Sequence, residues 1–175
     1  MTPGPHSPLK VGLLSGNTGG PGVPILAGET LRHGLFEGSR LLTAKGELGV
    51  EKLRPGDRVV TRNFGMAAVR QVICTRMPVG APQVRIPANA LGRNRPEGDA
   101  FLLCDQPVVV RDWRAQALFG AREARVAAER LADGKVIHLV PSSGCPVWSL
   151  VFEEPAVLYM DGLEVVSAAK GTFGQ

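Results

Sequence analysis

Short apolar runs separated by turn residues dominate the chain from about residue 39 onward. The runs at 40–44, 58–62, 83–86, 101–104, 108–111, 136–140, 147–152, 156–160 and 163–166 each predict a short strand. Residues 66–76 predict one longer, irregular strand. Asp161-Gly162 separates two of these runs and is the dipeptide of a tight hairpin turn. Many short strands at close spacing predict an all-β domain.

Helical patterns are confined to short segments between these strands. Residues 50–57 predict one helical turn closed by a Pro55-Gly56 turn. Residues 87–91 predict a short helix, because Pro stands at a plausible first position and Gly follows the last. The Ala-rich stretch 112–131 predicts short helices or turns. The apolar positions expected in the core are Leu41, Val50, Leu53, Val59, Val69, Leu131, Ile137, Leu150 and Val157.

One segment of the chain is echoed later in the sequence. Residues 50–56 read VEKLRPG and residues 128–134 read AERLADG, so Glu, a basic residue, Leu and Gly recur in the same order. The two copies lie 78 residues apart (129 minus 51), and a β-rich run follows each. The echo predicts two similar β subdomains related by pseudo-symmetry.

The chain divides into three parts by composition. Residues 1–33 are rich in Pro and Gly and predict a flexible arm, 34–168 predict the β domain, and 169–175 predict a tail. The glycine-rich run at 16–22 lacks the Lys-Ser/Thr and the helix that a phosphate-binding loop requires. Neither a classical signal peptide nor a membrane span is present, which predicts a cytoplasmic protein or export by a route without a signal peptide.

Composition makes nucleic-acid and metal binding poor explanations. The 175 residues carry a net charge of +4, but the arginines are scattered and aromatic residues make up 5%, so we predict a mildly basic surface and no specific nucleic-acid partner. The three cysteines form no CxxC pair, and His6, His33 and His138 are not at ligand spacing. We predict buried free thiols at Cys74, Cys104 and Cys145, with no metal and no cofactor.

Residues 39–62, SRLLTAKGELGVEKLRPGDRVVTR, resemble the opening block of the Hedgehog/intein (Hint) domain family. The later segments AERLADGKVI (128–137) and VWSLVFEEPAVLYMDGLEV (147–165) resemble the family's second Leu-x-x-Gly block and its final hairpin. The resemblance implies a disc of short strands with two pseudo-symmetric halves and a few short helices. The bacterial Hint-like group is the most similar variant, which implies a larger fused or neighbouring protein as the partner.

The resemblance also implies a chemistry, autocatalytic cleavage of the chain. In active members a Cys at the domain start attacks the preceding carbonyl by an N–S acyl shift, and a His assists departure of the amine. Registering Gly38-Ser39 on the family's Gly-Thr places Gly34 at the nucleophile position. Residues 103–108 place Pro107 at the His position, or Gln106 after a one-residue shift. Gly34 has no side chain to attack the carbonyl, and neither Pro107 nor Gln106 can donate a proton to the departing amine.

Other parts of the implied machinery are also absent. Ser149 falls where a second family His often lies, and the end KGTFGQ lacks the His-Asn pair that inteins use for release. Cys104 is the weak candidate for a relocated nucleophile. Ser39 as a nucleophile, His33 as a general base and Cys145 in the turn at 142–146 are less favoured still.

Three functions therefore remain open from the sequence. The first is a Hint-like domain that has lost autoprocessing and serves as a structural or interaction module. The second is an active self-cleaving or protein-splicing domain with a non-standard nucleophile such as Cys104. The third is a small basic binding protein with an unrelated β-barrel fold.

Overall fold

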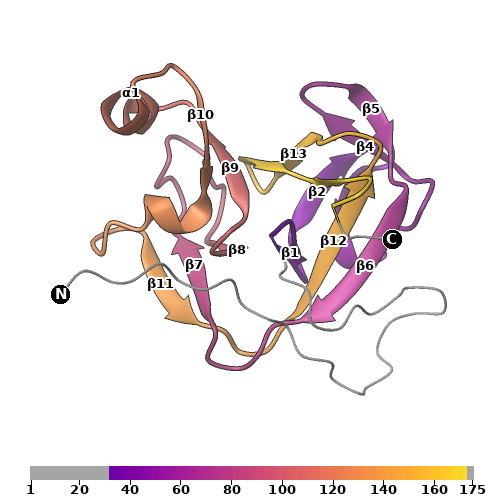
Figure 1. Cartoon of the computed structure of the whole chain (residues 1–175), viewed down its shortest axis with the longest axis horizontal. Coiled ribbons are helices and arrows are strands. Elements are labelled where there is room, and N and C mark those ends of the chain that lie inside the picture. The colour runs from indigo at the N-terminus through magenta and orange to yellow at the C-terminus, as the bar shows by residue number, and fades with distance from the viewer. Residues whose placement is uncertain (1–31, 173–175) are drawn as a thin grey trace.

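The computed structural model describes residues 32–172, in which fifteen strands form two sheets beside one short α-helix (Figure 1). The all-β prediction is confirmed. The expected arm at 1–33 lies outside the described residues except for its last two. Viewed down the shortest axis, β7–β11 and α1 lie on one side and β2 and β4–β6 on the other, with β1, β12 and β13 between them.

The seven-stranded sheet has the order β11-β7-β8-β1-β12-β15, and β6 also pairs with β12. Its strands are β1 (Leu35–Phe36), β6 (Gln71–Arg76), β7 (Pro82–Ile86), β8 (Ala100–Leu103), β11 (His138–Pro141), β12 (Pro146–Phe152) and β15 (Ala168–Ala169). The parallel β12–β15 pair is the exception in an otherwise antiparallel sheet.

The eight-stranded sheet has the order β10-β9-β14-β13-β2-β4-β5, and β3 also pairs with β2. Its strands are β2 (Arg40–Thr43), β3 (Gly46–Gly49), β4 (Arg58–Thr61), β5 (Gly65–Ala68), β9 (Pro107–Val110), β10 (Ala124–Ala127), β13 (Val157–Met160) and β14 (Leu163–Val166). Asp161 and Gly162 both have positive φ between β13 and β14, as the predicted Asp-Gly hairpin requires.

The segment predicted as one strand at 66–76 is two strands in different sheets. β5 pairs with β4 in the eight-stranded sheet, whereas β6 pairs with β12 in the seven-stranded sheet. The chain crosses between the sheets at Val69 and Arg70, whose amides bond to Asp57 O and Val151 O. Alternation of apolar residues reports that a segment is extended, but it does not report which sheet the segment joins.

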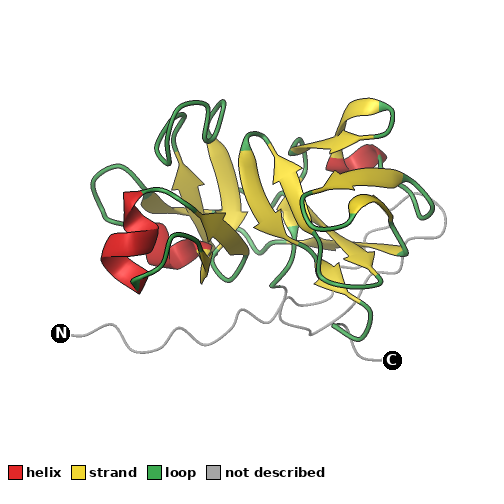
Figure 2. Cartoon of the chain, turned by 90° about the horizontal axis from the view of Figure 1, so that it is seen from above, coloured by secondary structure: helices red, strands yellow, loops and turns green. Residues whose placement is uncertain are grey.

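The predicted pseudo-symmetry is present in the backbone. The 3-10 turns η1 (Val50–Lys52) and η2 (Ala128–Leu131) follow β3 and β10, and these are the echoed segments of the sequence. Val50 N–H donates to Ser39 O at 2.8 Å, and Ala128 N–H donates to Gln106 O at 2.9 Å. Ser39 and Gln106 therefore occupy equivalent places in the two halves. Helical segments lie toward opposite ends of the molecule in Figure 2.

The core contains every apolar position predicted from the sequence, since all nine are buried. The predicted helix at 87–91 is wrong, because this segment forms turns in which Asn89 has a φ of 63°. The strand β10 within 112–131 was not predicted. Its residues Ala124-Arg125-Val126-Ala127 have helix-compatible composition, and pairing with β9 overrides that preference.

The helix α1 (Trp113–Phe119) is an addition to the second half. The β2–β3 connection is the dipeptide Ala44-Lys45, whereas the equivalent β9–β10 connection contains the whole of α1. Asp112 caps the helix by accepting from Arg114 N–H at 2.9 Å, and Gly120 ends it in the left-handed conformation. Among residues 32–172, no helix has the length and apolar character needed to cross a membrane.

Candidate functional site

Gly34 is buried at the start of β1, between two other strands of the seven-stranded sheet. Leu35 pairs with Trp148 of β12 on one side and with Leu102 of β8 on the other. One step back along both antiparallel ladders, Gly34 lies level with Ser149 and Leu103. The position implied for the nucleophile therefore lies in the interior, beside Ser149, for which the resemblance implies the position of a second family His.

Gln106 and Pro107 lie close to this junction. Gln106 N–H donates to Leu103 O at 3.1 Å, which links the turn after β8 to the strand beside Gly34. The Gln106 side chain is 1% exposed, and its Nε2 donates to Pro107 O and to Val166 O, each at 2.9 Å. Its amide is committed to two backbone carbonyls, and an amide has no proton to transfer at neutral pH.

His33 contacts the same carbonyl oxygen as Gln106. Its Nδ1 lies 3.1 Å from Val166 O, and because a carbonyl only accepts, Nδ1 carries the proton in this contact. The residues on either side of the candidate scissile bond are thus fixed, His33 to β14 and Gly34 between β8 and β12. The ring of His33, a less favoured candidate for a general base, is partly buried and bonded to this carbonyl.

Ser149 has no hydrogen-bond partner among the described residues, although its side chain is fully buried. Its neighbours on the same pair of strands, Thr75 Oγ1 and Trp148 Nε1, are buried and unpartnered as well. Polar atoms in such positions are uncommon in folded proteins and concentrate where function shaped the interior. Ser149 is level with Gly34, whereas Trp148, the preceding residue of β12, faces the opposite side of the sheet.

Cys104 lies in the turn after β8 and is directed away from Gly34. Its Sγ donates to Pro82 O at 3.4 Å, and Pro82 belongs to β7, on the opposite side of β8 from β1. Burial raises the pKa of the Cys104 thiol to about 11, with further increases from Glu129 and Asp105. At neutral pH a thiol of this kind is protonated and is a poor nucleophile.

The remaining candidates lie apart from the junction or are committed elsewhere. Ser39 is buried beside the pseudo-symmetric turn, where its backbone joins β2 to η1. Cys145 is exposed, which contradicts the predicted buried thiol, and its Sγ lies 3.0 Å from Ser143 Oγ. Cys74 is buried as predicted, and burial raises its pKa. No group of side chains able to hold a metal occurs in the part of the chain that the structure describes.

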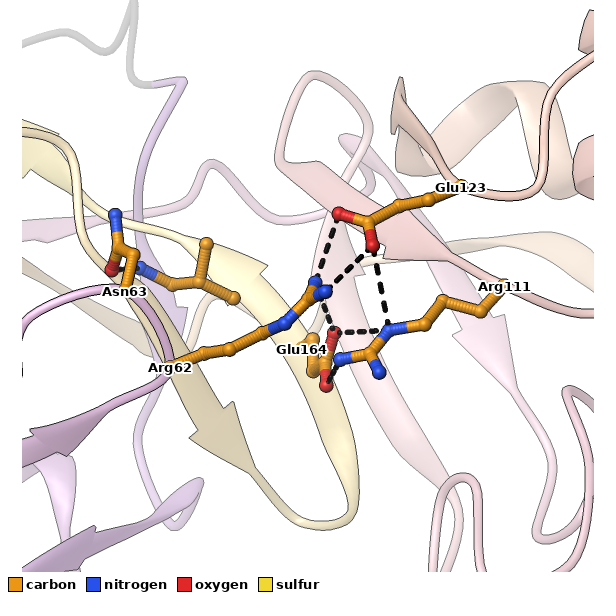
Figure 3. Close-up of polar contacts among 6 residues, drawn as sticks. Arg62, Asn63, Arg111, Glu123 and Glu164 are labelled. Carbon is orange, nitrogen blue, oxygen red and sulfur yellow. Dashed lines mark hydrogen bonds and ion pairs between the residues drawn. The ribbon is translucent and has the colours of Figure 1, made fainter.

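A charged cluster joins the two halves and was not found from the sequence. Arg62 donates through NH2 to Glu123 at 2.7 Å, and Arg111 Nε donates to Glu164 at 3.1 Å (Figure 3). Arg62 NH1 also reaches Glu164 at 3.4 Å, so both guanidinium groups share this buried carboxylate. The hydrogen bond to Arg62 lowers the pKa of Glu123. These residues are far apart in sequence, and no local pattern links them.

Comparison with known proteins identifies the family of this chain. Residues 33–172 match the family model of the Hint domain, so the chain belongs to the Hint domain family. This match overturns the alternative of an unrelated β-barrel. A search of curated proteins finds no match.

Solved structures share the fold at low sequence identity. The solution structure of a bacterial intein-like domain from Clostridium thermocellum has a TM-score of 0.55 and 15% identity, over 77% of this chain and 98% of that one. The crystal structure of a variant of the MchDnaB-1 intein has a TM-score of 0.50 and 13% identity, over 77% of this chain and 99% of that one. Both are similar to this chain in fold.

Proposed function

We propose that this Hint domain has lost autoprocessing and serves as a structural or interaction module, attached to or acting with a larger protein. The observation that carries the proposal is the junction at Gly34. Gly34 offers no side chain to attack the carbonyl of His33. The neighbouring amide of Gln106 is held by two carbonyl groups, and the ring nitrogen of Pro107 carries no proton.

Acyl transfer needs these groups together. A nucleophile must attack the carbonyl before residue 34, and an acid must protonate the departing amine. Ser149 stands at the second His position and cannot supply that proton at neutral pH, because a hydroxyl is too weak an acid. Several positions of the implied catalytic site carry residues that cannot do the chemistry, which supports loss of the reaction. The contributions of catalytic groups that act together are far from additive.

The alternative, autoprocessing with Cys104 as the nucleophile, has little support in the geometry. The thiol faces β7, and burial holds its pKa at about 11, so only a small fraction is ionised near pH 7. An attack on the bond before Gly34 would have to pass through β8.

The test uses a fusion that carries a tag before residue 33. Intact mass spectrometry and gel mobility report whether it is cleaved, with and without added thiol. We expect a single uncleaved species in both conditions. Cleavage between residues 33 and 34 would contradict the proposal. If Cys104→Ala abolished that cleavage, the relocated nucleophile would replace the proposal, whereas Cys145→Ala serves as the matched thiol control.

A further inference from the structure

The strand β5 (Gly65–Ala68) has an open edge. It is the last strand of the eight-stranded sheet, and within residues 32–172 β4 is its single partner. The ladder continues with Val69 N–H donating to Asp57 O at 2.9 Å. Because hydrogen-bonded and non-hydrogen-bonded pairs alternate in an antiparallel ladder, the N–H and C=O groups of Met66 and Ala68 are directed away from β4.

Within the described residues this edge is short, but it lacks charge, Pro and a covering strand. Natural sheets protect edge strands with charged residues, Pro or a covering segment. The sequence of β5 is Gly-Met-Ala-Ala, with neither a charge nor a Pro. By contrast, the edge strand β10 carries Arg125 and the edge strand β11 ends at Pro141. Met66 is 44% exposed and Phe64, in the preceding turn, is 50% exposed.

A cavity of about 270 Å³ lies between β5 and the turn that joins β12 to β13. Its lining residues are Phe64, Ala67, Ala68, Arg70, Phe152, Glu153 and Glu154. Pockets for small-molecule ligands are usually about 300–1,000 Å³. The smaller volume and apolar floor suit one inserted side chain better than a free ligand.

The frame of this cavity is fixed before anything binds. Asn63 Nδ2 donates to Pro155 O at 3.0 Å, and Val157 N–H donates to Asn63 Oδ1 at 3.0 Å. These two bonds hold the β4–β5 hairpin against the β12–β13 turn. A preformed site lowers the ordering cost of binding.

The rim of the cavity carries two cationic and two anionic side chains. Glu153 is paired with Arg70 at 3.3 Å and with Lys170 at 3.5 Å. Glu154, beside it, is exposed and forms no ion pair with any residue that the structure describes. Among residues 32–172, Glu154 is therefore the rim charge left without an ion-pair partner, and it lies next to an apolar cavity.

We propose that the open edge of β5 binds an extended, basic peptide segment of a partner protein. The segment adds to the sheet as a further strand through the outward groups of Met66 and Ala68. It places an apolar side chain in the cavity and a Lys or Arg side chain against Glu154. The inference rests on the proposed role as an interaction module and names the chemistry of the partner.

The test uses a fluorescein-labelled ten-residue peptide of alternating Thr and Val, with a central Leu and an Arg two positions away. A second, otherwise identical peptide carries Asp in place of Arg. Fluorescence anisotropy measures the binding of each peptide to the tagged full chain. We expect the Arg peptide to bind about two- to five-fold more tightly than the Asp peptide, as expected for one exposed ion pair. Glu154→Gln should remove this preference, and Glu129→Gln, the matched control on η2, should keep it.

Ala68→Pro removes an outward N–H while leaving the ladder to β4 intact, so it should weaken both peptides by about ten-fold or more. If this variant does not fold, Ala67→Leu, which fills the cavity, should weaken binding instead. Unchanged binding by a folded Ala68→Pro variant, or no binding of either peptide to the unsubstituted chain, would overturn the proposal. So would a dimer in sedimentation that Ala68→Pro dissociates, because the occupant would then be a second copy. If the peptides do not bind and the tagged fusion stays uncleaved, only the proposal of peptide binding at β5 is overturned. If the fusion is cleaved and the peptides bind as expected, only the proposed loss of autoprocessing is overturned.

Discussion

Gly34 is buried just before β1, and the resemblance to the family implies that it stands at the nucleophile position. Gly34→Cys alone should leave the tagged fusion uncleaved, because departure of the amine still lacks a proton donor. Gly34→Cys combined with Pro107→His should recover slow cleavage before residue 34 when thiol is added. Pro107 pairs with Ala127 in a regular strand, so the backbone there accepts a non-proline residue. Intact mass after overnight incubation measures the product.

The matched control for this experiment is Gly34→Ser with Pro107→His, which is not open to thiol exchange at a thioester. Equal cleavage of Gly34→Cys with and without Pro107→His would show that the position of Pro107 is irrelevant to the reaction. It would also refute the assignment of the two positions to one site.

The two echoed turns, η1 and η2, each bring a leucine into the core. Leu53 and Leu131 follow or end these turns and are 0% and 3% exposed. Leu53→Ala and Leu131→Ala should each lower the free energy of unfolding by about 2–5 kcal/mol, since each leaves a cavity in the core. Urea denaturation followed by circular dichroism gives the two values. Losses below about 0.5 kcal/mol at both positions, typical of surface changes, would contradict a core shared by duplicated halves.

Asp133 organises the turn after η2. Its Oδ1 accepts from the amides of Lys135, Val136 and Ile137, and these bonds lower its pKa from 3.8 to about 2. A lowered pKa means that the carboxylate stabilises the fold fully above pH 3.8, and that this stabilisation is lost as pH falls toward 2. Asp133→Asn should therefore be destabilising at pH 6, with the difference from the unsubstituted chain narrowing below pH 3.8. Thermal unfolding at a series of pH values measures it, and a constant difference would disprove the role.

Local sequence reported the elements well and their partners poorly. The Asp161-Gly162 hairpin, the turn at Val50 and the buried apolar positions follow from local pattern, because turn chemistry and burial act over a few residues. The helix expected at 87–91 was wrong, and Ala88 N–H instead donates to the Asp99 side chain, Oδ1, at 3.1 Å, which stabilises turns there. The assignment of Gly34 and Pro107 to the family's nucleophile and His positions came from the resemblance and stays a prediction. The contact of His33 with Val166 was not predictable, because 133 residues separate them.

At the scale of the whole molecule, the charged cluster ties the two halves to the final hairpin. Arg62 follows β4, Arg111 follows β9, and Glu164 belongs to β14. Glu164→Gln keeps the shape of the side chain but removes the charge shared by two guanidinium groups. This substitution should lower the free energy of unfolding by about 1.5–3 kcal/mol, the range for hydrogen bonds to charged groups. Glu153→Gln breaks an exposed cluster of ion pairs and should lower the free energy of unfolding by about 0–1 kcal/mol.

Urea denaturation of both variants at low and high salt measures this difference. The Glu164→Gln loss should persist at high salt, because the carboxylate is 9% exposed and poorly screened. Equal small losses for the two variants would show that the cluster is a surface feature without structural weight.

The order β1-β12-β15 brings the two ends of the domain beside the same central strand. Leu35 is level with Trp148, and Ala168 is level with Val151, so entry and exit are two strands apart and three residues apart along β12, a separation of about 14 Å. A loop of a host protein whose ends are this close accepts such a domain with little change in its own path. Insertion into the middle of another polypeptide is therefore geometrically as easy for this domain as fusion at a terminus.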